Sequence, residues 1–246
     1  MPQLGTLEKS DGTHTKIGED TFTEIMKAHY PTHTEERKVK YCKTKRIITA
    51  ELKDKYEDWI NKDRIIKALL GFKAKKSPGP DGIKPIIFPH IPNNIINCIE
   101  IIYKSCIALQ FTPSSWKEAK VIFIPKNGKD RYDKAKSFRP ISLSNYLLKG
   151  LEKLCVWKVE EDLLKAPIHK NQHGFQKGKS TETAISKTVN LIEKHMNNGK
   201  KCIGVFLDIQ GAFDTIDPKY ITQELKKHTN ESDLIAWYFN LSLIHI

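Results

Sequence analysis

The sequence predicts a mixed fold of α-helices and β-strands, of the α+β or α/β class. Apolar residues recur every three or four positions over most of the patterned chain, which is typical of amphipathic helices. Two short apolar runs lack that period and predict strands, and helical patterns separate them. The sequence has no internal repeat and no low-complexity tract, so each element is interpreted on its own signals.

Helical patterns account for most of the expected elements, and several have a local start or stop signal. Asn61 and Ser180 can each cap a first turn, and Gly71 can end a helix. Residues 76–82 contain two prolines and two glycines, which predict a stiff turn. Residues 1–55 are polar and are expected to form a loose leader with one helix. The expected helices cover residues 22–29, 61–71, 93–107, 144–155, 180–196, 219–227 and 233–240.

The two apolar runs predict strands with different roles. Val121–Ile124 is expected to be a short buried strand. Cys202–Leu207 is the more apolar run and should deliver Asp208 at its C-terminal end, where α/β proteins commonly place their sites. Gly211 then permits a sharp turn that returns Phe213 toward the same edge.

Charge and cysteine usage restrict the functional class. The 41 Lys and Arg exceed the 29 Asp and Glu by 12, which favours a polyanionic partner. Residues 117–179 alone contain 15 basic and 7 acidic residues. No apolar run approaches the ~20 residues of a membrane span, and residues 1–20 do not resemble a secretory signal. The five scattered cysteines favour a reducing compartment, so we expect an intracellular protein of the cytoplasm, the nucleus or both.

Two sets of residues could carry chemistry. A strand-end carboxylate such as Asp208 can bind a divalent cation, and the alternative, which is the more common role of such residues, is a cap of the following turn. Lys126 directly follows a strand, and Arg139 precedes Pro140 on extended backbone, so a hairpin would suit them to grip a triphosphate. The alternative for this pair is a solvated basic loop. Gly174–Ser180 is one residue short of a phosphate-binding P-loop, and an ATPase is rejected.

Five short blocks then occur in a characteristic order, and together they carry a family resemblance. The blocks are Lys76–Ile83, Trp116 with Val121–Lys126, Ser137–Leu143, Gln172–Thr181 and Phe206–Asp214. In this order they closely resemble the reverse transcriptase domain of non-LTR (LINE-like) retrotransposons, especially the jockey type of arthropods.

The resemblance implies an α+β fold of the right-hand polymerase kind, and DNA synthesis on an RNA template with two Mg²⁺. Asp208 would be a catalytic metal ligand, assisted by the backbone carbonyl of Ile209. The implied partners are an RNA template, a DNA primer and a dNTP, with no membrane. By the same resemblance Lys126 and Arg139 would grip the triphosphate, Phe213 would lie under the sugar, and Gln172, Gly174 and Phe175 would lie near template and primer.

The sequence also departs from the family. An aromatic-x-Asp-Asp block is expected downstream of Asp208, and the chain contains no Asp-Asp pair. The implied fold is therefore the fingers plus an incomplete palm, with the thumb absent and the chain truncated. The expected regions are a leader over 1–55, fingers over 56–140, and fingers with partial palm over 141–246.

These departures leave the catalytic status open. Because a lone Asp208 cannot hold two metal ions, we expect the chain alone to be catalytically incomplete as a polymerase. The alternative function is a non-catalytic basic module that binds nucleic acid. A third interpretation, in which the positive charge is incidental to a soluble scaffold, would be excluded if substitutions of Lys126 and Arg139 lowered RNA affinity.

Overall fold

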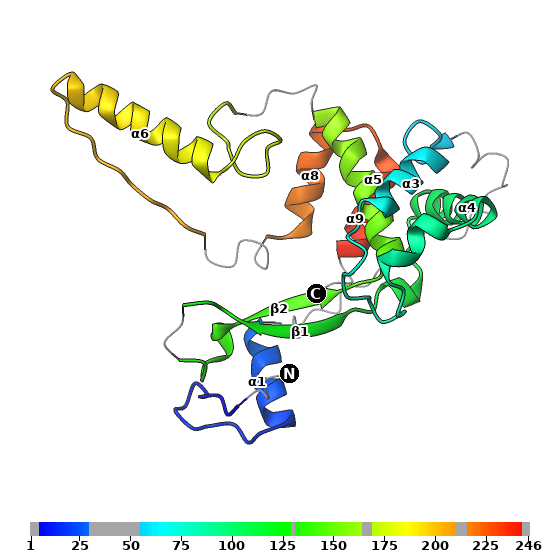
Figure 1. The fold of residues 1–246 in the computed structure, drawn as a ribbon, viewed down its shortest axis with the longest axis horizontal. Helices are drawn as coiled ribbons and strands as arrows, with labels where there is room; N and C mark the ends of the chain where they lie inside the picture. Colours follow the sequence, from blue (N-terminus) through cyan, green and yellow to red (C-terminus); the bar gives the residue numbers. More distant parts are fainter. Residues whose placement is uncertain (1–4, 30–54, 129–130, 164–168, 210–215, 243–246) are drawn as a thin grey trace. The chain divides into compact units, whose positions relative to one another are not determined.

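The structure is a computed structural model that describes residues 5–29, 55–128, 131–163, 169–209 and 216–242 (Figure 1). The contacts divide the chain into two compact units. One comprises Met1–Lys158 with Glu231–Ile246, and the other comprises Val159–Asn230. Helices and one two-stranded sheet make up the described elements, which confirms the mixed class. The expected regions 1–55, 56–140 and 141–246 stay predictions.

The first unit has a helical core. Its helices are α3 (Lys62–Leu70), α4 (Asn93–Leu109), the first part of α5 (Tyr146–Leu163) and α9 (Ser232–Ser242), with short 3₁₀ helices at Pro85–His90 and Ser114–Trp116. Large side chains fill the space between them, and Trp59, Tyr103 and Trp237 are almost completely buried. α9 packs against α4 although more than a hundred residues separate them in the chain. The helical core is thus closed by a distant segment.

The predicted start and end of α3 are confirmed. The Asn61 side chain accepts a hydrogen bond from the backbone N–H of Arg64 at 3.0 Å, and Gly71 follows the last helical residue. The expected turn at residues 76–82 is also confirmed, since the N–H of Gly82 donates to the carbonyl of Gly79 at 3.2 Å. Gly79 is needed there for space: a Cβ atom would lie 2.5 Å from Oδ1 of Asn145.

The only sheet within the described residues is a hairpin. β1 (Lys120–Pro125) pairs antiparallel with β2 (Phe138–Leu143), and the short 3₁₀ helix Ala135–Ser137 leads into β2. The strand at Val121–Ile124 is confirmed, but its expected burial is wrong, because the Ile124 side chain is 49% exposed. Among the residues that the structure describes, only one face of this two-stranded hairpin is covered, by Leu7 and Ile25, which pack against Phe138. Because successive side chains of a strand point to opposite faces, alternate side chains are open to solvent.

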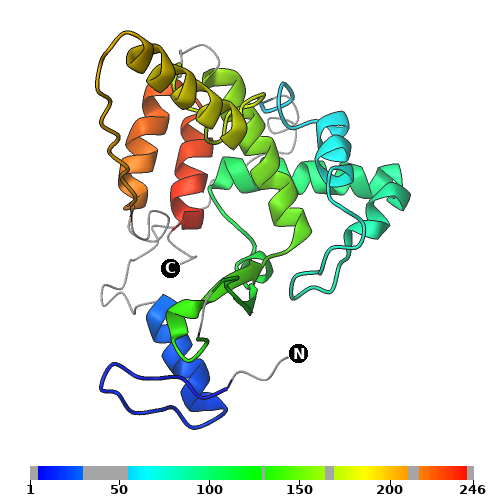
Figure 2. The same cartoon turned by 60° about the vertical axis from the view of Figure 1, so that its left-hand side comes forward.

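The one helix expected in the N-terminal leader is confirmed, and it begins three residues before the expected Phe22. Residues 5–29, the N-terminal segment, fold into a loop followed by α1 (Glu19–His29). α1 lies against the hairpin in both views (Figures 1 and 2). Leu7 and Ile25 are buried there with Phe138. Contacts with residues far away in the chain therefore hold this segment in place, although its composition is polar. Residues 30–54 of the expected leader lie outside the described residues.

The second unit contains α6 (Thr181–Asn197) and α8 (Pro218–His228) together with the end of α5. Both helices begin at local caps: Ser180 and Thr183 form a capping box, and Asp217 accepts from the N–H of Lys219 at 2.9 Å. The apolar face of α6 is open, since no residue of this helix is buried. None of the helices in the described residues is long and apolar enough to cross a bilayer.

The expected strand at Cys202–Leu207 is wrong. Residues 201–209 form no strand, and the side chains of Ile203, Phe206 and Leu207 are each more than 90% exposed. Figure 2 shows this stretch after α6 as an irregular trace. A strand forms only when a neighbour accepts and donates its backbone hydrogen bonds, and the described residues pair no strand with this segment. The apolar composition of this run therefore indicates a propensity to form a strand, but the described residues contain no strand that pairs with it.

Candidate functional site

The hairpin places Lys126 and Arg139 close together along the ribbon. Arg139 pairs with Ile124, and Lys126 follows the last residue of β1. The N–H of Lys126 donates to the carbonyl of Ser137 at 2.8 Å, so the pairing continues one step beyond the strands. Paired residues share a face, and so do residues two apart on a strand. Arg139 and Lys126 are therefore diagonal neighbours on the face that carries the exposed Ile124.

The Lys126 side chain is held by the loop that follows it. Its ammonium donates to the carbonyl of Lys136 at 2.7 Å, and its own carbonyl accepts from the Tyr132 hydroxyl at 2.8 Å. An ammonium has three N–H groups, so two remain for an anion. Arg139 is exposed, and within the described part of the chain its guanidinium forms no ion pair. The pair thus combines a positioned point charge with a planar fork of donors, a set that suits phosphate oxygens.

The loop over residues 169–180 is closed by a lysine. The Lys179 ammonium donates to the carbonyl of Gln172 at 2.7 Å and to the carbonyl of Lys170 at 3.1 Å. At the other side of the loop, Nδ1 of His173 and the hydroxyl of Thr183 lie 2.8 Å apart, which ties the loop to the first turn of α6. The ammonium of Lys179 therefore holds two backbone carbonyls of its own loop close together.

Phe175 stands out within this loop. Its φ angle is 57°, in the left-handed region that residues other than glycine rarely adopt, and its side chain is 96% exposed. Such a backbone costs on the order of 1 kcal/mol, and observed outliers of this kind gather at functional sites. The side-chain amide of Gln172 donates to the carbonyl of Gly174, two residues further along, at 3.5 Å. The loop thus presents one aromatic ring to solvent, where a nucleic acid base could stack.

Asp208 and Ile209 lie in the exposed segment that follows α6. Asp208 is exposed, and the Ile209 side chain is 74% exposed. The expected turn at Gly211 and the return of Phe213 lie outside the described residues, as does Asp214. Lys126 and Arg139 lie together in the first unit. Gln172, Gly174 and Phe175 lie together in the second unit, which also contains Asp208.

The described residues do not fit the two-metal site that the resemblance implies. Within residues 5–29, 55–128, 131–163, 169–209 and 216–242, no three His, Cys, Asp or Glu side chains gather so that they could hold a metal ion. Asp208 contributes one carboxylate, whereas two Mg²⁺ about 4 Å apart need several oxygen ligands.

Two residues of the site carry no role in the sequence-based expectations. The sequence places Lys179 in a rejected P-loop and in the block Gln172–Thr181, without a role of its own, yet this lysine donates to two carbonyls of the loop that presents Phe175. Tyr132 has no motif around it, yet its hydroxyl contacts the backbone of Lys126. A signal is present only for Lys179, whose position directly before the capping Ser180 places it at the start of α6.

Comparison with known proteins identifies related sequences. Residues 124–244 match the reverse transcriptase (RNA-dependent DNA polymerase) family. The probable RNA-directed DNA polymerase from transposon BS of Drosophila melanogaster is 30% identical over 169 residues, which are 68% of this chain and 18% of that protein. The RNA-directed DNA polymerase from mobile element jockey of the same species is 34% identical over 144 residues, which are 58% of this chain and 16% of that protein.

A third relative matches more of the chain. The retrovirus-related Pol polyprotein from type-1 retrotransposable element R1 of Bradysia coprophila is 27% identical over 234 residues, which are 94% of this chain and 22% of that protein. The chain thus spans about a fifth of the length of these curated relatives. The resemblance that the five ordered blocks indicated is confirmed by these relatives.

Proposed function

Because residues 124–244 of this chain belong to the reverse transcriptase family, we propose that the chain functions as part of an RNA-directed DNA polymerase of a non-LTR retrotransposon. In this proposal the chain carries a hairpin that grips the incoming dNTP and a loop that contacts template and primer. The partners are accordingly an RNA template, a DNA primer and a dNTP. The proposal concerns the part of such a polymerase that these residues represent.

The observation that carries the proposal is the register of the hairpin. Pairing of Arg139 with Ile124 puts its guanidinium on the same open face as Lys126. A guanidinium and an ammonium that converge on one face suit the closely spaced oxygens of a triphosphate better than either cation alone. In right-hand polymerase terms, we assign this hairpin to the fingers and the segment with Asp208 to the palm.

The metal and sugar contacts complete the proposal. Asp208, with the carbonyl of Ile209, is proposed as one ligand position for Mg²⁺, and Phe213 as the residue under the incoming sugar. The chemistry that Mg²⁺ supplies in phosphoryl transfer is neutralisation of the charge on the transferring group. Asp208 on its own is an incomplete ligand set, so the assignment rests on the resemblance of the block around it.

Replacing Arg139 with alanine is expected to lower the affinity for dNTP about tenfold, because a charge-assisted hydrogen bond of ~1.5–3 kcal/mol is lost. Binding of a fluorescent dNTP in the presence of Mg²⁺ measures the effect. The matched control is Arg131→Ala, since Arg131 is exposed in the loop between β1 and β2 and pairs with Asp133 at 2.5 Å. Equal losses in both variants would mean that only net charge matters and would contradict the proposed contact.

Replacing Phe175 with alanine is expected to lower the affinity for single-stranded RNA about tenfold, because stacking of one base contributes ~1–3 kcal/mol. Fluorescence anisotropy with a labelled RNA measures the change. Tyr220→Ala is the control, because Tyr220 lies on α8 of the same unit and is 71% exposed. An unchanged affinity in Phe175→Ala, or the same loss in both variants, would contradict a template or primer contact at this loop.

A further inference from the structure

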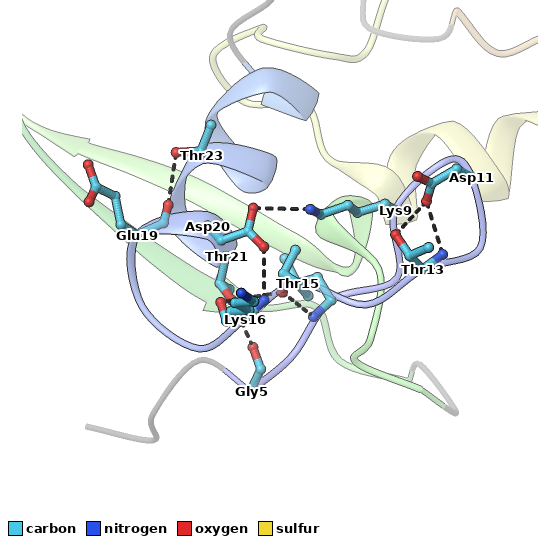
Figure 3. A network of polar contacts seen from close by, with 11 residues as sticks. Gly5, Lys9, Asp11, Thr13, Thr15, Lys16, Glu19, Asp20, Thr21 and Thr23 are labelled. Atoms are coloured by element: carbon cyan, nitrogen blue, oxygen red, sulfur yellow. Dashed lines mark hydrogen bonds and ion pairs between the residues drawn. The ribbon is translucent and has the colours of Figure 1, made fainter.

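The N-terminal segment, residues 5–29, has an internal hydrogen-bond network that ties its loop to the first turn of α1 (Figure 3). The N–H of Leu7 donates to the hydroxyl of Thr15 at 2.8 Å, and that hydroxyl lies 2.8 Å from the hydroxyl of Thr21. Lys9 pairs with Asp20 at 3.1 Å across the same loop. Both threonines are buried. The segment is therefore a small ordered piece of structure.

Apolar contacts join this segment to the hairpin. Leu7 and Ile25 are 1% and 0% exposed, and they form one buried cluster with Ala135 and Phe138. Phe123 of β1 packs against the cluster. Leu7 and Ile25 are its two most buried members, so the N-terminal segment supplies the most deeply buried side chains of this cluster.

Two polar contacts tie the segment to the loop between the strands. The N–H of Glu8 donates to the carbonyl of Asp133 at 2.6 Å. Nε2 of His29 lies 3.0 Å from the carbonyl of Ala135. The contacted carbonyls lie just before Lys136 and Ser137, whose carbonyls accept the side-chain and backbone N–H groups of Lys126. The segment thus anchors the part of the loop that holds Lys126.

We propose that the N-terminal segment is a positioning element of the nucleotide-binding hairpin, and that Leu7 and Ile25 are its positioning residues. A two-stranded hairpin is only marginally stable without an apolar face to pack against, and here residues 5–29 supply that face. The segment contacts no proposed ligand group itself and acts by holding Lys126 and Arg139 in one geometry. The functional consequence rests on the function proposed above, whereas the structural consequence does not.

The test compares two matched substitutions in the full chain. Ile25→Asp places a carboxylate in the buried cluster, and Ile17→Asp makes the same change where the side chain is 73% exposed. In Ile25→Asp we expect amide hydrogen exchange in β1, β2 and the loop between them to rise about tenfold or more. The affinity for dNTP should fall about tenfold, and the affinity of the loop around Phe175 for RNA should not change. Ile17→Asp should leave all three quantities within about twofold.

The outcomes separate the positioning role from the proposed function. Unchanged exchange in the hairpin of Ile25→Asp overturns the inference. Faster exchange with unchanged dNTP affinity overturns the functional part. Failure of the unsubstituted chain to bind dNTP overturns the proposed function, while the exchange data still decide the structural part. Amide hydrogen exchange in α3, α4 and α9 shows whether Ile25→Asp unfolds the first unit as a whole. If it does, the milder variant Ile25→Ala replaces it, and the same outcomes decide the inference.

Discussion

Replacing Lys104 with methionine is expected to lower the free energy of unfolding by about 3 kcal/mol at pH 7. Lys104 lies on α4 with a side chain that is only 3% exposed, and its ammonium pairs with Glu57 and, at 2.8 Å, with Glu100. Glu100 is itself 13% exposed. Removing the cation would leave the largely covered carboxylate of Glu100 without its counter-charge, which costs much more than the ion pair is worth in net stability.

The pH dependence is set by the pKa of Lys104. Burial lowers this pKa, but hydrogen bonds to Glu100 and Glu57 outweigh burial and raise it above the ordinary value of 10.5. A raised pKa in the folded state contributes stability that is complete below pH 10.5 and is lost as the pH rises through the folded-state pKa. The difference between the unsubstituted chain and Lys104→Met should therefore shrink only in strong alkali.

Urea unfolding monitored by tryptophan fluorescence measures the loss at Lys104. Lys62→Met is the matched control, because Lys62 is exposed on α3, and it should change stability by less than about 0.5 kcal/mol. Adding Glu100→Leu to Lys104→Met should recover part of the loss, since it removes the orphaned carboxylate. A loss of the same size in Lys62→Met, or none in Lys104→Met, would contradict the role of the buried ion pairs.

Replacing Gly150 with valine is expected to lower the free energy of unfolding by about 3 kcal/mol or more. Glycine is normally unfavourable inside a helix, so a substitution in α5 would stabilise it on propensity alone. Packing reverses that sign: a Cβ atom would lie 2.6 Å from the Tyr103 hydroxyl and 3.0 Å from Cδ2 of Leu69. Tyr103 is fully buried and donates to the carbonyl of Leu147 at 2.6 Å, so it cannot move aside without losing that bond.

The same urea experiment tests Gly150, with Gly174→Val as the control. A Cβ atom at Gly174 would meet nothing within 4 Å, and its φ is not positive, so stability should change by less than about 0.5 kcal/mol. Gly150→Ala should show a smaller loss than Gly150→Val, because only the first carbon is added. Higher stability in Gly150→Ala would mean that helix propensity outweighs the contact and would contradict the prediction.

The site was predictable from the sequence to the extent that its signals were local. The block Ser137–Leu143 and the run before Lys126 indicated a hairpin with two cations, and the register of β1 and β2 confirms the hairpin. The presentation of Phe175 was not predictable, because no local signal marks a phenylalanine for a positive φ, which glycine normally adopts. The expected delivery of Asp208 by a strand was wrong for the described residues, since strand formation needs a partner that the run itself does not specify.

The sequence by itself determined the first residues of α3 and α6, the last residue of α3, the turn at residues 76–82 and the family resemblance, because caps, stop signals and motif order reside in neighbouring residues. It did not determine the end of α5, which runs to Leu163 rather than to the expected Cys155. Only the tertiary structure decided that the polar N-terminal segment orders the hairpin, that α9 closes the helical core, and that the apolar run Cys202–Leu207 is exposed. Each of these depends on contacts between segments far apart in the chain. Whether an apolar side chain is buried depends on such contacts, because an apolar composition makes burial favourable but does not supply the partner that covers the side chain.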